Sequence, residues 1–475
     1  MTELHIMAER KAMDMKHEYN VKYLWLICVV AALGGLLFGY DYVVIGGAKP
    51  FYEKFFDLTT AFQIGWAMSA ALVGCLAGSV ISGGLSDKLG RKRLLILSGF
   101  LFTISAIGTA LANSFVAFVM YRLVGGIGMG LASTLAPIYI AEVSPASMRG
   151  RFVSINQLTI VIGILAAQLI NWLIAEPVAE GATAQEILNS WNGQMGWRWM
   201  FGAEILPALL FFFFMFIVPE SPRWLVKNAK DAMAYNILGK IGGKSYARDT
   251  IAYIKDTLFD EIKKVNFRDL VEPKMIRILM VGVILAVFQQ WCGINVIFNY
   301  AEEVFTAAGY GISDILLNIV ITGTVLVVFT SVAIYTVDRW GRRILMLAGA
   351  SGLAIIHVLI GTSYYFHSRG IHVLILVGIA IACYSFSLAP VTWVILAEIF
   401  PNRIRGAAMS ISVFSLWSAN FVLTYTFPIL NNCLGASFTF WIYAGICVLG
   451  FCFIKRRLPE TKGKTLEEIE MELVD

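Results

Sequence analysis

Long apolar segments alternate with short polar stretches along almost the whole chain. Twelve of these segments are long enough for the roughly 20 residues that a bilayer-spanning helix needs. Six lie before a charged central stretch, at 23–45, 61–84, 94–112, 115–140, 152–175 and 199–218. Six follow it, at 275–300, 315–337, 344–366, 371–397, 407–430 and 437–454. The pattern predicts an all-α integral membrane protein with twelve transmembrane helices in two six-helix bundles.

The central stretch from Pro219 to Pro273 is crowded with lysine, aspartate and glutamate, a charge density that cannot lie in hydrocarbon. It is expected to form short amphipathic cytoplasmic helices, with Gly242-Gly243 as a break between them. The expected organisation is a tail, a bundle, a helical linker, a second bundle and a second tail, at 1–21, 22–218, 219–273, 274–456 and 457–475.

The composition supports a membrane protein. The 475 residues are 58% hydrophobic and 15% charged, with a mean hydropathy of +0.73, whereas soluble domains are about 45–50% apolar and about 25% charged. Basic flanks of membrane helices account for the net charge of +5, so no nucleic-acid partner is expected. The first twenty-one residues are polar and show no small-residue cleavage site, so no signal peptide is expected.

Basic residues gather on one side of the predicted membrane. With the N-terminus inside, the tails, the linker and four short loops face the cytoplasm, where lysine and arginine are normally in excess. The 37 Lys and Arg all fall there except Lys49, Lys54, Arg122, Arg198 and Arg369. The sequence therefore predicts a multi-pass protein of the cell (inner) membrane with both termini in the cytoplasm.

The sequence shows no mark of a metal or catalytic site. The seven cysteines are scattered, without a CxxC pair, and no His-rich cluster accompanies them. No HExxH or nucleophile-elbow motif occurs. We therefore expect no enzyme activity, no metal and no cofactor.

One charged constellation occurs once in each half of the chain, in the same order. It comprises a Gly-rich basic loop, a glutamate seven residues before an Arg-Gly pair, and a closing Pro-Glu pair. The copies lie at Gly84–Arg93, Glu142, Arg149 and Pro219-Glu220, and at Asp338–Arg343, Glu398, Arg405 and Pro459-Glu460. A chain made of two parallel copies of one unit is typical of internal-repeat transporters.

Together these motifs resemble the sugar porter family of the major facilitator superfamily, and most of all its bacterial D-xylose–proton symporters. The match covers both halves and nearly the whole chain. The resemblance implies two bundles that rock around a midplane site, and a cytoplasmic gate that forms in the outward-facing state. It places that gate on Arg91, Glu142, Arg149, Glu220, Arg342, Glu398, Arg405 and Glu460. If these residues only set the orientation of the protein in the membrane through the positive-inside rule, the arginines would be explained but the paired carboxylates would not.

Two ionisable residues lie inside predicted spans of the first half, Asp41 and Arg122. Each would cost about 2.5–3.5 kcal/mol at the bilayer centre, so a functional role is expected. An aspartate that takes up a proton releases its arginine, which couples charge to conformation. The resemblance agrees, because proton symporters of the family have Asp here and passive facilitators typically have Asn. A static ion pair is the alternative, and Glu204 in the sixth span is expected to be a structural partner.

Uncharged amides cluster in the middle of the seventh predicted span, at Gln289, Gln290 and Asn295. Such amides are costly in a membrane helix unless they face a cavity or a partner, and they donate to and accept from sugar hydroxyls. Gly293 would permit local unwinding beside them. The resemblance matches these residues, with Gln157 and Trp393, to sugar-contacting positions, and Trp417 completes the expected substrate site. Hydrogen bonding between helices is the structural alternative.

Several positions depart from the xylose symporters that the chain resembles. Where those symporters have glutamines in the fifth and eleventh spans, this chain has Ile164 and Leu416. Where they have a tyrosine after the Gln-Gln helix and a glycine in the tenth span, this chain has Asn299 and Ala389. Isoleucine is the residue type found at the Ile164 position in glucose facilitators, so the preferred sugar remains open among xylose, glucose, galactose and arabinose.

The expected function is proton-coupled import of a monosaccharide by a monomer in the lipid bilayer. A passive facilitator is the alternative, and a sugar sensor on the same scaffold is a remote one.

Overall fold

Every described element is helical. The computed structural model describes residues 18–179, 181–261, 272–368, 370–400 and 405–462. The first half contains α2 (Val21–Phe55), α3 (Ala61–Leu89), α4 (Arg91–Leu111), α5 (Phe115–Val143), α6 (Ala146–Ile174), α7 (Ala184–Asn189), the π-helical η1 (Asn192–Gly196), α8 (Trp197–Gly202) and α9 (Ile205–Ile217). Two further helices follow, α10 (Pro222–Lys227) and α11 (Asp231–Glu261).

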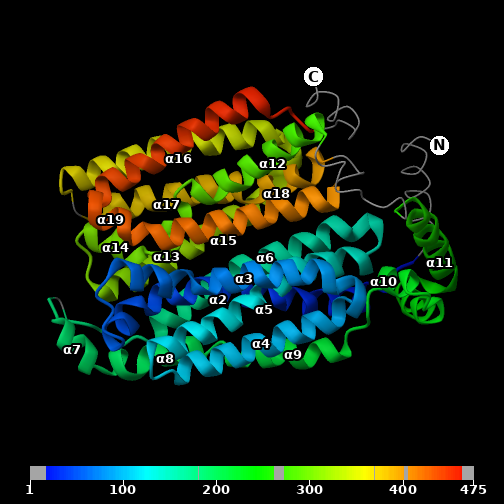
Figure 1. Ribbon diagram of the computed structural model, residues 1–475, viewed down its shortest axis with the longest axis horizontal. Helices are drawn as coiled ribbons and strands as arrows, with labels where there is room; N and C mark the ends of the chain where they lie inside the picture. Colours follow the sequence, from blue (N-terminus) through cyan, green and yellow to red (C-terminus); the bar gives the residue numbers. More distant parts are fainter. Residues whose placement is uncertain (1–17, 180, 262–271, 369, 401–404, 463–475) are drawn as a thin grey trace.

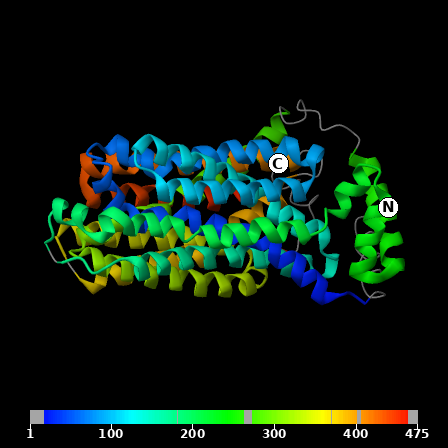
Figure 2. The same cartoon turned by 90° about the horizontal axis from the view of Figure 1, so that it is seen from below.

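The described part of the second half contains α12 (Pro273–Trp291), α13 (Ile294–Asn299), α14 (Ala301–Ala307), α15 (Ile312–Trp340), α16 (Arg342–Tyr365), α17 (Ile371–Phe386), α18 (Leu388–Ile399) and α19 (Arg405–Arg457). Helices α2–α9 and α12–α19 form two bundles that lie side by side (Figure 1). Helices α10 and α11 lie beyond one end of both bundles (Figure 2). We call the opposite end, which carries Leu58, Asn113 and Tyr310, the distal end.

The number of membrane crossings agrees with the sequence. Eleven described helical stretches are long and apolar enough to cross a bilayer. The last of these, Ala407–Arg457, has 51 residues and is interrupted at Gly435, whose φ of 78° is not helical. This stretch therefore holds two crossings, which brings the total to the expected twelve. A second predicted break is also confirmed, because Gly242 and Gly243 interrupt α11.

Glycines let helices α3 and α5 pack backbone against backbone. A Cβ on Gly126 would lie 2.0 Å from the carbonyl oxygen of Ala71, and one on Gly74 would lie 2.1 Å from that of Leu123. These distances leave no room for a side chain. Small residues at such crossings are the usual way for membrane helices to gain contact area. The packing holds α5, and with it Arg122, close to the core of the first bundle.

The seventh crossing is broken where the sequence predicts local unwinding. Helix α12 ends at Trp291, and Gly293 adopts a left-handed conformation with φ 88° before α13 begins at Ile294. Glycine takes this conformation without the steric cost that a Cβ imposes. Helix α14 follows after a further kink at Tyr300. The break turns the amide-bearing residues on either side of Gly293 toward one another.

Candidate functional site

Asp41 and Arg122 form a buried ion pair inside the first bundle. Both side chains are 1% exposed, and Arg122 Nη1 donates to Asp41 Oδ1. Arg122 Nη2 also donates to the backbone oxygen of Asp41 at 3.0 Å. The pairing that the sequence predicts between the first and fourth spans is therefore present. Because such a pair rarely repays its desolvation, a role beyond stability is the better explanation for it.

The pair leaves polar atoms without a partner among the described residues. Asp41 Oδ2, Arg122 Nε and Glu204 Oε1 are buried and make no hydrogen bond. Glu204 lies between α8 and α9, is 1% exposed and interacts electrostatically with both members of the pair. The Phe201 ring covers the guanidinium at 5.4 Å. A carboxylate with one free oxygen, beside a second carboxylate, has an atom on which a proton can be placed.

The amides of the seventh crossing bind one another across the break at Gly293. Gln290 Nε2 donates to Gln289 Oε1 at 2.6 Å, and Asn295 Nδ2 donates to Gln290 Oε1. Gln289 Nε2 also donates to the hydroxyl of Tyr384 on α17 at 2.9 Å. All three amides are buried, with 4–6% exposure. The structure thus brings together three of the residues predicted to bind sugar, and adds Tyr384, which the sequence reading missed.

The other predicted substrate residues lie on separate helices. Trp417 on α19 is 5% exposed and packs edge-on against Phe38 of α2, with ring centroids 5.6 Å apart. Trp393 on α18 is 37% exposed, and Gln157 on α6 is partly exposed. The residues come from both bundles, as a site between them requires. Their role in substrate binding stays a prediction.

A second group of polar side chains joins the bundles one turn beyond Asn295. The Tyr42 hydroxyl on α2 accepts hydrogen bonds from Asn299 Nδ2 at 3.3 Å and from Asn420 Nδ2 at 3.2 Å. It also donates to Asn420 Oδ1 at 3.4 Å. Asn299 was noted in the sequence as a departure, but Tyr42 and Asn420 were not singled out. The one available signal was Tyr42 itself, a polar side chain inside the first apolar span.

Lys49 is buried at the distal end, where it contacts the second bundle. The sequence predicts it on the outer side, beyond a span that ends at residue 45, whereas α2 continues to Phe55 and the Lys49 side chain is only 4% exposed. Its ammonium lies 2.7 Å from Glu53, 2.8 Å from Glu302 and 2.9 Å from Glu303. The three carboxylates offset the cost of burying a lysine. Glu302 and Glu303 belong to α14, so the cluster fastens α2 to the other half.

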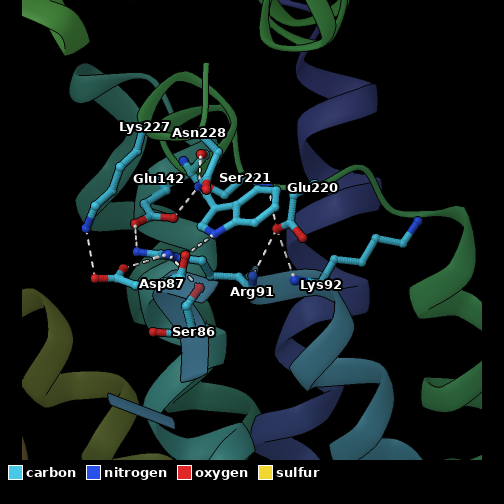
Figure 3. Close-up of polar contacts among 10 residues, drawn as sticks. Ser86, Asp87, Arg91, Lys92, Glu142, Glu220, Ser221, Lys227 and Asn228 are labelled. Atoms are coloured by element: carbon cyan, nitrogen blue, oxygen red, sulfur yellow. Dashed lines mark hydrogen bonds and ion pairs between the residues drawn. The ribbon is translucent and has the colours of Figure 1, made fainter. Parts of the chain in front are cut away.

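The repeated motif of the first half surrounds the start of α4 (Figure 3). Arg91 Nη2 donates to Glu142 Oε1 at 3.0 Å. Glu220 Oε1 accepts from the backbone N–H groups of Arg91 and Lys92 at 3.0 and 3.1 Å, which caps the helix. Gly90 makes this approach possible, since a Cβ there would lie 2.2 Å from Glu220 Oε2. An anion at a helix N-terminus is favourable because unpaired N–H groups point at it.

The second half repeats this arrangement at the start of α16. Arg342 Nη2 donates to Glu398 Oε1 at 3.1 Å, and the Glu460 carboxylate accepts from the backbone N–H groups of Arg342 and Arg343 at 2.8 and 3.1 Å. Gly341 has φ 91°, close to the 93° of Gly90. The duplication seen in the sequence therefore corresponds to one local structure built twice.

These contacts differ from those of a latch between bundles. Both described pairs, Arg91 with Glu142 and Arg342 with Glu398, lie within a single half. Arg149 Nε donates to the Ala141 carbonyl oxygen, again within the first half. The side chain of Arg405 lies outside the described residues. In this conformation the described polar contacts between the halves include the ion pairs of Lys49 with α14 at the distal end and the hydrogen bonds of Tyr42 with Asn299 and Asn420.

Comparison with known proteins decides the family. A family model described as "Sugar (and other) transporter" matches residues 27–473, nearly the whole chain. The chain belongs to the sugar transporter family. It is thus a multi-pass membrane transporter with the twelve-helix major facilitator fold and not an enzyme, as the sequence predicts.

Individual members of this family are similar over their full length. The D-xylose-proton symporter of Escherichia coli (strain K12) is 40% identical over 487 residues, covering 96% of this chain and 97% of that protein. The glucose transport protein of Synechocystis is 40% identical over 465 residues, covering 95% and 97%. The inward-open structure of the xylose transporter XylE from E. coli superposes with a TM-score of 0.82 at 37% identity, covering 94% and 99%.

Proposed function

We propose that this protein is a proton-coupled monosaccharide symporter that imports a sugar such as D-xylose by alternating access. The observation that carries the proposal is the buried Asp41–Arg122 pair with one carboxylate oxygen free. A passive transporter needs no such group inside its bundle. The similar E. coli protein named D-xylose-proton symporter supports the same activity.

Protonation of Asp41 is the proposed coupling step. A proton on this carboxyl group removes its negative charge, so the attraction that holds Arg122 weakens and the guanidinium is free to turn to Glu204. Helices α2 and α5 can then shift relative to each other. One proton that moves down 100 mV releases about 2.3 kcal/mol, enough for roughly fiftyfold accumulation of a neutral solute.

The sugar is proposed to bind between the halves, at the broken seventh crossing. Gln289, Gln290 and Asn295 supply amide donors and acceptors, and sugar hydroxyls would replace some of the bonds that these amides now make with one another. Trp393 and Trp417 offer aromatic faces for the C–H side of the ring. Gln157 contributes an amide from the first half.

The proposed orientation places the distal end outside the cell. Both termini and helices α10 and α11 then lie in the cytoplasm of a cell whose inner membrane holds the protein as a monomer. The basic loops before α4 and α16 fall on the inner side, in agreement with the positive-inside rule. The eight repeated arginine and glutamate residues would form the cytoplasmic gate when the distal end opens.

Uptake of labelled D-xylose into proteoliposomes tests this function. With an inward proton gradient the lumen should accumulate sugar above the external concentration, and a protonophore should abolish the accumulation but not equilibration. Equilibration alone, with or without the gradient, would instead establish a passive facilitator. If only a non-sugar solute were carried, the assignment of the amide site would be wrong.

A further inference from the structure

The amides of the seventh crossing are part of a longer column of polar side chains. Gln289, Gln290 and Asn295 form its first part, which starts at the Tyr384 hydroxyl. Asn295 and Asn299 are four residues apart on α13, so they lie on one face of the helix. Asn299 continues the column to Tyr42 and Asn420. This set of seven residues is called the polar column below.

Tyr42 is the member of the polar column that comes from the first bundle. It follows Asp41 directly on α2, whereas the other six members lie on α12, α13, α17 and α19. Its ring stacks on Phe38 at 6.2 Å, and Phe38 contacts the Trp417 ring. Tyr42 therefore reaches from the helix that carries the proposed proton site to the helices that carry the proposed sugar site.

The hydrogen bonds of the Tyr42 hydroxyl are long. Its three contacts measure 3.2, 3.3 and 3.4 Å, at or beyond the upper end of the usual ranges, which are about 2.7–3.2 Å for N–H···O bonds and about 2.5–3.0 Å for O–H···O bonds. One hydroxyl is shared between two amides that it does not approach closely. A ligand hydroxyl that came between them could make shorter bonds, so the exchange would cost little.

We propose that Tyr42 is a specificity-determining residue, whose hydroxyl binds one hydroxyl of the sugar together with Asn299 and Asn420. The inference rests on the proposed function and assigns a further contact within the same site. A sugar that carries this hydroxyl in the right orientation completes the polar column across both halves. A sugar without it leaves the tyrosine and the two amides with their long, weak bonds.

The geometry also explains how sugar recognition can reach Asp41. The bond from the sugar to Tyr42 would hold α2 against α13 and α19, and Asp41 is the preceding residue of α2. A bound sugar thereby biases the position of the helix that carries the proton site. The bond to this one sugar hydroxyl would therefore both distinguish between sugars and favour the conformation in which the site is closed.

The test compares D-xylose with analogues that each lack one ring hydroxyl, measured as inhibition of labelled xylose exchange. In the wild type, loss of the hydroxyl that Tyr42 binds should weaken inhibition about 5- to 10-fold. In Tyr42→Phe, xylose itself should weaken by a similar factor, and removal of that same hydroxyl should then have no further effect. The other analogues should keep their wild-type ratios to xylose.

Tyr52→Phe is the matched control. Tyr52 lies on the same helix and donates to Met68 Sδ within the first bundle, so its removal should leave the pattern of inhibition unchanged. If every analogue kept its wild-type ratio to xylose in Tyr42→Phe, the inference would be overturned, whether or not the affinity for all of the sugars fell by one common factor. That outcome is distinct from failure of the proposed function, which the wild type itself would show, either by carrying no sugar or by equilibrating xylose without a response to the proton gradient.

Discussion

Lys49 Nζ lies 2.8 Å from Glu302 Oε2 and so ties α2 of the first half to α14 of the second. The contact is at the distal end, where Glu303 and Glu53 also approach the same ammonium. Rocking of the two halves that opens the distal end would have to break the bonds between Lys49 and α14. The energy of this cluster is therefore part of the balance between the two orientations of the transporter.

Replacement of Lys49 by Gln should favour the state with an open distal end. Loss of one partner of a buried ion pair costs about 3–5 kcal/mol, because the remaining charges stay uncompensated. Spin labels at Thr59 and Thr306, on exposed sites of opposite halves, should report longer distances. Lys54→Gln removes an ammonium that is 36% exposed and should change little. Identical distance distributions for Lys49→Gln and the wild type would show that the cluster does not hold the halves together.

The left-handed residue in the seventh crossing should not tolerate a side chain. In Gly293→Ala, the φ of 88° costs about 1–2 kcal/mol. The new Cβ also lies 2.9 Å from the Tyr443 Cβ and 3.0 Å from His357 Nε2. Thermal unfolding in detergent should show a clear loss of stability. Gly378→Ala, where no atom lies within 4 Å of an added Cβ, is the control and should be neutral or stabilising.

Glu220 and Glu460 should contribute equally to stability, since each caps the start of an equivalent helix. Substitution by Gln keeps an acceptor oxygen but removes the charge at the helix N-terminus, a loss of about 0.3–1 kcal/mol. Substitution by Ala removes the cap itself and should cost about 0.5–2 kcal/mol. Chemical or thermal unfolding of the four variants measures this order. A destabilising Glu220→Ala beside a neutral Glu460→Ala would contradict the structural equivalence of the two copies.

Gln290 should be essential for sugar affinity. Its side chain both donates to Gln289 and accepts from Asn295, so Gln290→Ala leaves two buried amides with an unmade bond as well as removing a ligand for the sugar. We expect xylose binding to weaken by about 1–3 kcal/mol, or roughly 5- to 150-fold. Calorimetry on purified protein measures the change. Gln185→Ala, on the exposed face of α7, should bind as the wild type does.

The sequence was sufficient for the fold because the features that define it are local. Apolar length set the twelve crossings, and a single glycine, Gly293, was enough to predict the break in the seventh. Asp41 and Arg122 could be paired because two buried charges of opposite sign are rarely left apart. These inferences need no knowledge of how distant helices face each other.

Contacts between helices were harder to predict. Lys49 lies beyond the apolar span predicted at 23–45, and the sequence around it does not reveal its partner Glu302, which lies 253 residues further along the chain. Tyr42 is a polar side chain inside an apolar span, but the sequence does not indicate its partners Asn299 and Asn420, which come from two further helices. Glu220 and Glu460 were recognised as repeated residues, but their part as helix caps depends on the turn of the backbone at Gly90 and Gly341.

The most direct test of the account is proton movement on addition of sugar. D-xylose added outside lightly buffered proteoliposomes should make the external medium more alkaline, because each sugar enters with a proton. Asp41→Asn should abolish this alkalinisation while exchange of labelled xylose across the membrane continues. Alkalinisation that persisted in Asp41→Asn, or a wild type that transported xylose without any pH change, would contradict coupling through the Asp41–Arg122 pair.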